Sequence, residues 1–141
     1  MPETRSEYNA NIISEFHANQ GRVGGIWEET PLLLLHHTGA KSGASRVNPV
    51  AYLPNDPGYL IWAANGGAPN HPDWYHNVNA HPATRIEVGS EVIEVVAEEA
   101  SGEERERLFA KATKRYPQLA EVASKTHRVI PMIILTPRRR G

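Results

Sequence analysis

Cysteine is absent from the chain, and so are long apolar runs and any excess of charge of one sign. The lack of cysteine excludes a disulfide framework and thiolate metal sites, and it fits a protein of the reducing cytoplasm. No apolar stretch approaches the roughly 18 residues of a membrane-spanning helix, and the N-terminal region has no secretory h-region. With 15 basic and 16 acidic residues the formal net charge is −1. No nucleic-acid partner is therefore expected, and any anion site must be local.

The length and the order of the expected elements predict one mainly β domain of the α+β class. At 141 residues the chain is expected to form a single domain, 1–141, with a sizeable core. The elements lack the regular strand–helix alternation of a parallel sheet and predict a β-barrel of about six strands with inserted helices. They are a helix over 7–19, strands over 32–35, 47–52 and 59–64, a helix over 72–80, strands over 84–88 and 91–98, helices over 102–116 and 119–125, and a strand over 132–135.

Three of the predicted strands have informative patterns. Leu32 to Leu35 run without alternation, which is typical of a strand covered on both faces. Pro49 restricts the next strand to an edge or bulged position, because proline cannot donate to a sheet ladder. Val92 and Val96 alternate with polar residues after Gly89-Ser90, which predicts a hairpin with a two-residue turn.

Two helices have recognisable ends. Glu7 to Asn19 carries apolar residues at helical spacing and stops before Gly21, so residues 1–25 are predicted to form an N-terminal helix and a flexible lead-in. This helix is expected to lie on the domain. The alternative is a lid or a weak contact with a membrane surface, although basic residues are sparse there. Ser101 to Glu104 matches a capping box at the start of a later helix.

The loop between the first two strands carries the clearest chemical signal. Gly39-Ala40-Lys41-Ser42-Gly43 is not a P-loop, because its Lys-Ser pair precedes the second glycine and no helix follows. Lys41, Arg46 and several free backbone N–H groups nevertheless predict a binding site for a phosphate or carboxylate group. A guanidinium can hold either anion in bidentate geometry. The alternative is an ordinary hairpin turn with solvated cations.

Two further clusters are candidates for ligand contact. Ala63-Ala64-Asn65-Gly66-Gly67 places small residues at a strand end, where a flat ligand can approach the backbone closely. A flexible loop is the alternative interpretation. Asp73-Trp74-Tyr75-His76-Asn77 puts two aromatic residues at a helix N-terminus, and there the alternative is a pair of buried core aromatics.

The seven histidines do not predict a metal site. His36 and His37 are adjacent in a strand and point to opposite faces, and His71, His76 and His81 are five residues apart, so no pair has the H-x-x-x-H spacing of a helical metal site. A hydrolase is not supported either, because there is no G-x-S-x-G motif and no base for a serine nucleophile.

Together the three clusters resemble the deazaflavin-dependent nitroreductase family, the split β-barrel reductases that use coenzyme F420. The family pattern T-G-x-K-S-G-x-x-R-x-x-P corresponds to TGAKSGASRVNP over Thr38–Pro49. A small-residue strand end with Gly-Gly corresponds to ANGG over Ala64–Gly67, and P-x-W-Y-x-N to PDWYHN over Pro72–Asn77. The similarity extends from about Leu32 to Pro137. It implies a split, FMN-binding-like barrel.

The resemblance also implies residue roles. Lys41, Ser42 and Arg46 would hold the phosphate and glutamate tail of the cofactor, and Asn48 to Val50 would lie beside its ribityl chain and ring. The deazaflavin head would contact backbone groups of Ala64 to Gly66. The full set implied for the cofactor is Ala40, Lys41, Ser42, Gly43, Arg46, Val47, Asn48, Pro49, Val50, Ala63, Ala64, Asn65, Gly66, Asp73, Trp74, Tyr75 and Asn77, with Trp74 and Tyr116 on the substrate side.

The resemblance implies an oxidoreductase that transfers a hydride from reduced F420 to a quinone, a nitro compound or an activated alkene. The cofactor supplies the hydride, so no catalytic side chain and no metal are expected. Leu119 and Val122 are aliphatic where nitroimidazole-activating members carry tyrosines, which argues against bulky nitroimidazoles. The alternatives are a barrel that binds FMN and a non-catalytic F420 carrier. The expected location is the cytoplasm, with peripheral membrane contact as the alternative.

Overall fold

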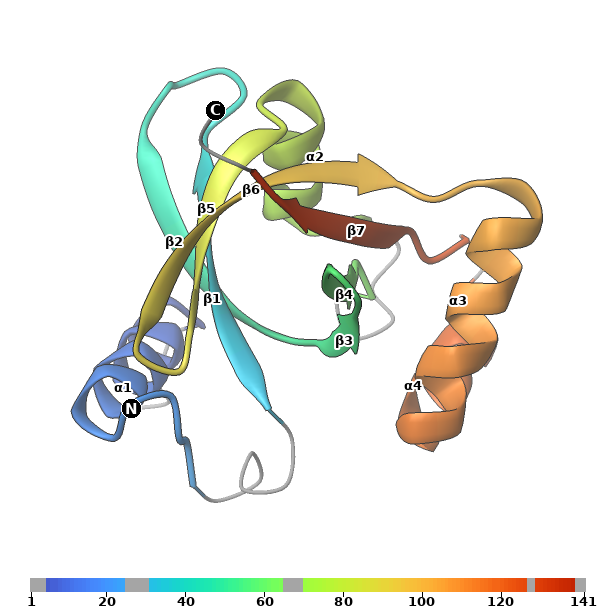
Figure 1. The fold of residues 1–141 in the computed structure, drawn as a ribbon, viewed down its shortest axis with the longest axis horizontal. Helices are drawn as coiled ribbons and strands as arrows, with labels where there is room; N and C mark the ends of the chain where they lie inside the picture. Colours follow the sequence, from blue (N-terminus) through green and yellow to red (C-terminus); the bar gives the residue numbers. More distant parts are fainter. Residues whose placement is uncertain (1–4, 25–30, 65–69, 127–128, 139–141) are drawn as a thin grey trace.

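The computed structural model describes residues 5–24, 31–64, 70–126 and 129–138. Seven strands and four helices form one mixed α and β structure (Figure 1). In chain order they are α1 (Arg5–Ala18), β1 (Leu32–Thr38), β2 (Ser45–Ala51), β3 (Leu53–Asn55), β4 (Gly58–Trp62), α2 (Asp73–Ala80), β5 (Ala83–Val88), β6 (Glu91–Glu99), α3 (Gly102–Arg115), α4 (Pro117–Ser124) and β7 (Met132–Pro137).

All seven strands belong to one antiparallel sheet with the order β2-β1-β5-β6-β7-β4-β3. The sheet curls into a half-barrel, because its two outermost strands, β2 and β3, are joined through Tyr52 (Figure 1). The predicted mainly β fold is confirmed, with seven strands in place of about six. The extra strand arises where the chain stops pairing with β1 at Ala51 and begins pairing with β4 at Leu53.

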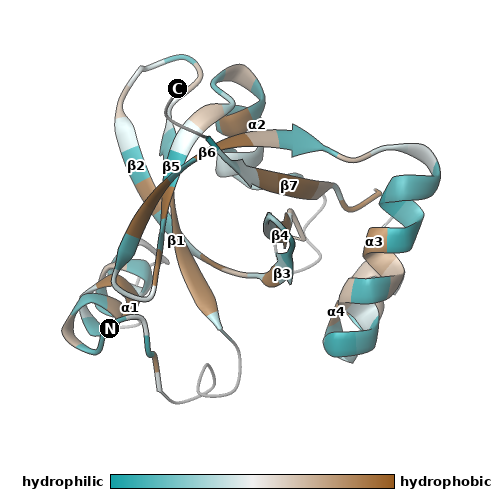
Figure 2. Ribbon diagram, in the orientation of Figure 1, coloured by the Kyte–Doolittle hydropathy of each residue, from teal (hydrophilic) through white to brown (hydrophobic). Residues whose placement is uncertain are grey.

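The leucines of β1 are covered on both faces, as their unbroken apolar run predicts. Leu33 and Leu35 lie in the main core inside the curl of the sheet, whereas Leu32 and Leu34 pack beneath α1 with Phe16. Figure 2 shows the part of β1 near its N-terminal end as hydrophobic. Pro49 is also in an expected place, because β2 is an edge strand of the sheet.

The apolar alternation in β6 does not mark its buried face. Val92 and Val96 are exposed, while Val95 and Ala97 are buried in the core. The two-residue turn pairs Val88 with Glu91, so the buried Ile86 lies opposite Ile93 and sets the inward face of β6. The hairpin is confirmed, but the tertiary register selects the other set of valines for burial.

α1 is attached to the outside of the sheet through its C-terminal end. Gly21, at φ 96°, donates its N–H to the Phe16 carbonyl at 2.8 Å and ends the helix. A Cβ on Gly21 would lie 2.6 Å from Cα of Gly89, in the β5–β6 turn, so a larger residue would not fit there. α1 therefore has a fixed place over the sheet.

α3 and α4 cover a second core, which contains Leu108, Ala112 and Tyr116. The capping box predicted at Ser101 does not form, because the Ser101 hydroxyl makes no cap hydrogen bond. Gly102, at φ 60°, departs from helical geometry at the first position of α3, which separates the serine from the N–H groups it would cap.

Candidate functional site

A cavity of about 710 Å³ opens between the edge of the sheet, α1 and the segment that leads into α2. It brings together two of the three sequence clusters, although these are more than 20 residues apart in the chain. Arg46, Val47 and Asn48 of β2 form one side, and Asp73 and Trp74 of α2 form another. The remaining lining residues are Asn9, Ala10, Ile13, His37, Asn70, His71 and Pro72.

A buried hydrogen-bond chain ties the cavity wall together. His37 is 3% exposed, and its Nε2 lies 2.7 Å from Oδ1 of Asn48. Its Nδ1 lies 2.9 Å from Nδ2 of Asn77, which is 6% exposed. Oδ1 of Asn77 in turn accepts the backbone N–H of Ala40 at 2.9 Å. This series of hydrogen bonds thus links β2, β1, α2 and the loop after β1.

His37 is the main residue of the site that the sequence motifs do not predict. Its burial lowers its pKa; the hydrogen bond to Asn48 acts in the opposite direction, and the positive charge of Arg46 lowers the pKa further. The signal that could have found it is a polar residue on the inward face of an otherwise apolar strand, next to the loop.

The loop after β1 is closed by its own hydrogen bonds. Gly39 N–H donates to the Ala44 carbonyl at 2.8 Å and Gly43 N–H to the Gly39 carbonyl at 2.9 Å, while Ala44 N–H donates to Oγ of Ser42 at 3.2 Å. The expectation of several free amide groups therefore needs correction. Within the part of the chain that the structure describes, only the N–H groups of Lys41 and Ser42 in this loop lack a partner.

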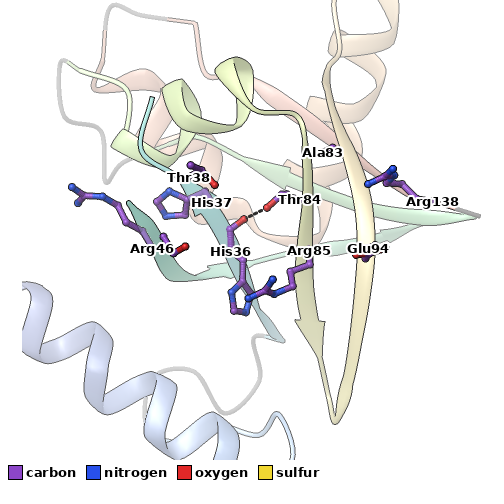
Figure 3. Close-up of a pocket in the computed structure, with 10 residues that line it drawn as sticks. His36, His37, Thr38, Arg46, Ala83, Thr84, Arg85, Glu94 and Arg138 are labelled. Carbon is purple, nitrogen blue, oxygen red and sulfur yellow. Dashed lines mark hydrogen bonds between the residues drawn. The ribbon is translucent and has the colours of Figure 1, made fainter. Parts of the chain in front are cut away.

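The two predicted cations are free to meet an anion. Lys41 and Arg46 are exposed, and neither side chain makes an ion pair or hydrogen bond with any residue the structure describes. Arg46 extends from β2 away from the sheet (Figure 3). It lines the large cavity, whereas Lys41, Ser42 and Gly43 form the exposed loop beyond it.

The remaining predicted contacts are distributed over the two cores. Val50, Ala63 and Tyr75 belong to the main core, and Pro49 pairs with Leu34 across the sheet edge. Ala64 packs against the second core. Asn65 and Gly66, together with Gly67, lie outside the described residues.

Tyr116 lies in the second core, not in the large cavity. It is 7% exposed, and its ring centroid lies 5.6 Å from that of Trp62. Its hydroxyl has no hydrogen-bond partner among the described residues. Burial raises the pKa of Tyr116, and the adjacent Arg115 partly offsets that shift.

A second, smaller cavity of about 220 Å³ lies on the outer side of β1, β5 and β6. Arg46, Arg85 and Arg138 line it, but Figure 3 shows the Arg46 and Arg138 side chains well apart, at opposite sides of the view. Arg46 and Arg138 therefore do not converge on one anion. The same view shows His36 and His37 leaving β1 on opposite sides, as their adjacency predicts.

Glu87 connects α1 to the sheet. One carboxylate oxygen lies 2.9 Å from Nε2 of His17 in α1, and the other lies 2.6 Å from Nε2 of His36 in β1. Burial acts to raise the pKa of Glu87, but the hydrogen bonds from the two histidines prevail, and the pKa lies below its usual value of 4.5.

This arrangement predicts a pH-dependent contribution to stability. Because the folded pKa is lowered, the carboxylate stabilises the fold above pH 4.5, and this contribution is lost as the pH falls through the folded pKa. Glu87→Gln should therefore lower the free energy of unfolding at pH 7 by about 1 kcal/mol. Below the folded pKa the two proteins should converge in urea unfolding, and a constant difference at every pH would contradict the assignment.

No group of three or more metal-ligating side chains occurs among the residues placed by the structure. Likewise, none of the described helices is long and apolar enough to cross a membrane. The Tyr75 hydroxyl donates to Oε1 of Glu99 at 2.6 Å.

Comparison with known proteins decides the family. The model of the F420H(2)-dependent quinone reductases matches residues 10–137. The chain belongs to this family. An F420H(2)-dependent quinone reductase of Mycobacterium tuberculosis is 35% identical over 127 residues, which cover 87% of this chain and 85% of that protein. The family is one of oxidoreductases whose cofactor is coenzyme F420, so the resemblance, the enzyme class and the cofactor predicted from the motifs are confirmed.

Solved structures support the family and the fold. An F420-H2 dependent reductase, FDR-A, superimposes with a TM-score of 0.68 at 40% identity, over 74% of this chain and 93% of that one. The heme storage protein HutZ of Vibrio cholerae superimposes with a TM-score of 0.58 at 14% identity, over 94% and 92% of the two chains. The second match shows the fold alone, and it confirms the split-barrel prediction.

The residues of the large cavity fit a flat cofactor with an anionic tail. Trp74 and Ile13 give the wall apolar surface, while Asn48 adds an amide, and Arg46 adds a cation that no carboxylate neutralises in the described chain. A volume of about 710 Å³ lies within the usual range for such sites.

Proposed function

We propose that this protein reduces quinones with a hydride from reduced F420, and that nitro compounds and activated alkenes are further acceptors. The observation that carries this proposal is the large cavity, in which two of the sequence motifs meet beside Arg46, which makes no ion pair with the residues that the structure describes, on a chain of the F420H(2)-dependent quinone reductase family. The cavity opens to solvent, so a ligand can enter it. The family to which the chain belongs uses F420 as its cofactor.

The binding roles follow from the chemistry of each wall. Lys41, Ser42 and Arg46 bind the anionic tail, because they supply two cations, a hydroxyl and two backbone N–H groups that have no partner among the described residues. Asn48 and the backbone up to Val50 lie beside the middle of the cofactor. Ala64 contacts the ring through its backbone. Asp73, Trp74 and Asn77 close the site, and Tyr116, which lies in the second core, does not line it.

Catalysis in this proposal consists of orientation. When bound, F420H2 would supply a hydride from its deazaflavin ring, and the reduced quinone would take its proton from water. The protein holds donor and acceptor face to face, and fixing two reactants at about 3–3.5 Å can supply several kcal/mol of barrier lowering. The apolar surface of Trp74 shields the reacting faces from water, while Arg46 and Asn48 keep the donor in register. No side chain needs to act as a nucleophile.

A fluorescence titration of the purified protein with F420 and with FMN tests the proposal directly. Binding of F420 at least tenfold tighter than FMN is expected, followed by oxidation of F420H2 when menadione is added. Preference for FMN would favour the FMN-binding alternative. Tight F420 binding without turnover on any quinone, nitro compound or activated alkene would favour the carrier.

Acceptor size gives a further prediction. Leu119 is buried in the second core and Val122 packs against it, so α4 offers neither a hydroxyl nor an aromatic face at these positions. The kcat/KM for menadione should exceed that for a bulky bicyclic nitroimidazole by more than tenfold. Equal values for the two acceptors would contradict this view of α4.

The proposal places the enzyme in the cytoplasm, and it leaves a weak membrane-surface contact of α1 as an added feature. Tyr8 on α1 is 38% exposed, which gives the helix one outward aromatic ring. Co-sedimentation with anionic lipid vesicles, compared between the protein and its Tyr8→Ser variant, measures that contact.

A further inference from the structure

His37 occupies the junction between the two motifs that meet at the cavity. It contacts Asn48 of the first motif and Asn77 of the last, and Asn77 holds the loop through Ala40. With 3% exposure its ring is almost entirely enclosed. Buried polar groups of this kind are costly unless every donor meets an acceptor, so the direction of each bond matters.

The backbone N–H of Ala40 fixes the direction of each hydrogen bond in this series. Ala40 N–H can only donate, so the atom of Asn77 that it meets is the carbonyl oxygen. The amide nitrogen of Asn77 then donates to Nδ1 of His37, which must be unprotonated. The ring proton therefore lies on Nε2 and is donated to Oδ1 of Asn48. Only the neutral Nε2–H tautomer satisfies all three bonds.

We infer that His37, in this neutral tautomer, is a positioning residue that holds Asn48 and the loop over residues 39–44 in the arrangement that binds the cofactor, and that its protonation weakens cofactor binding. The inference rests on the proposed function for the identity of the ligand. It concerns a residue outside the three motifs, and it adds a control of affinity by pH.

Protonation cannot be accommodated without losing a bond. A proton on Nδ1 faces the amide nitrogen of Asn77, so two donors meet. If the Asn77 amide rotates by half a turn to present its oxygen to His37, its nitrogen then faces the N–H of Ala40. Without this rotation, the Nδ1 proton of His37 has no acceptor. With it, the loop that carries Lys41 and Ser42 loses the hydrogen bond that holds it to Asn77.

The charges around His37 act in both directions. Arg46 on β2 and His36 on β1 disfavour the imidazolium, whereas Asp73 at the start of α2 favours it. An anionic tail bound at Arg46 would also favour the imidazolium. In our inference the loss of the hydrogen bonds outweighs this attraction, so affinity falls at low pH, and a rise in affinity at low pH would overturn it.

Three proteins test the inference: wild type, His37→Gln and His37→Phe. A glutamine can donate to Asn48 and accept from Asn77 without titrating, whereas phenylalanine fills the space and makes neither bond. By calorimetry at pH 8, F420 affinity should fall less than threefold in the glutamine variant and more than tenfold in the phenylalanine variant. His36→Gln, on the opposite face of β1, is the matched control and should leave affinity unchanged.

The pH dependence of F420 affinity distinguishes a positioning role of His37 from a packing role. Between pH 8 and 5.5 the affinity of the wild type should fall further than that of His37→Gln, and the difference should widen as the pH decreases. Titration of F420 itself is common to both proteins and cancels in the comparison. Equal pH profiles, or wild-type affinity in His37→Phe, would overturn the inference.

Measurements on the free protein distinguish this inference from the proposed function. Two-bond ¹H–¹⁵N spectra should show the Nε2–H tautomer of His37, and the Ala40 amide should exchange more than tenfold faster in His37→Phe than in His37→Gln. An Nδ1–H tautomer would refute the inference even if F420 binds. Failure of wild type to bind F420, with these spectra as expected, would instead refute the proposed ligand. If the phenylalanine variant fails to fold, the tautomer and the pH profiles still decide.

Discussion

Replacing Trp74 with alanine should lower kcat/KM for quinone reduction more than tenfold and should also destabilise the fold. Trp74 is 6% exposed, and it packs in the main core with residues such as Leu33 and Val78 while its surface lines the large cavity. Truncation of a buried tryptophan costs about 3–5 kcal/mol, which corresponds to a fall in Tm of roughly 10–20 °C for a chain of this size. Stopped-flow oxidation of bound F420H2, recorded well below the Tm, measures the catalytic part.

Two variants separate the two roles of Trp74. Trp74→Phe keeps much of the apolar volume, so it should recover most of the stability but only part of the activity. Val78→Ala, one turn further along α2, is the matched control because Val78 is buried in the same core and does not line the cavity. It should lower the Tm and leave F420 affinity within twofold. An unchanged kcat/KM in Trp74→Ala would assign this residue to the core alone.

Arg46→Ala should weaken F420 binding by about 1.5–3 kcal/mol, or roughly 10- to 150-fold, because a charge-assisted hydrogen bond is lost. Arg46 is exposed and makes no ion pair in the described part of the chain, so its removal should change the free energy of unfolding by less than about 0.5 kcal/mol. Arg46→Lys keeps the charge but loses the planar fork, and an intermediate affinity is expected. Isothermal titration calorimetry gives the three values.

Arg85→Ala is the matched control for Arg46. Both arginines line the small outer cavity, but only Arg46 also lines the large one. Loss of Arg85 should therefore leave F420 affinity unchanged. If both variants lose affinity equally, the anion site is general surface charge and not the cavity wall. Full affinity in Arg46→Ala with an intact fold would remove Arg46 from the site.

Local patterns were sufficient for much of the fold. The leucine run predicted a strand covered on both faces, and the structure places α1 on one side of it and the main core on the other. Pro49 predicted an edge strand correctly. In contrast, the alternation of Val92 and Val96 was uninformative about burial, because both faces of β6 carry valine and only pairing with β5 distinguishes them.

The sequence alone determined the family and the cofactor, because three short motifs in a fixed order depend only on residue identity and spacing, and it proposed a set of residues for the site. It could not determine which of those residues meet. Tertiary structure brings Arg46 and Trp74 into one cavity, sends Tyr116 to the other core, and closes most loop amides with internal hydrogen bonds. It also makes His37 the link between the motifs. The reason is physical: contact between distant segments is decided by strand register and by the packing of helices on a curled sheet, and neither is encoded within a single motif.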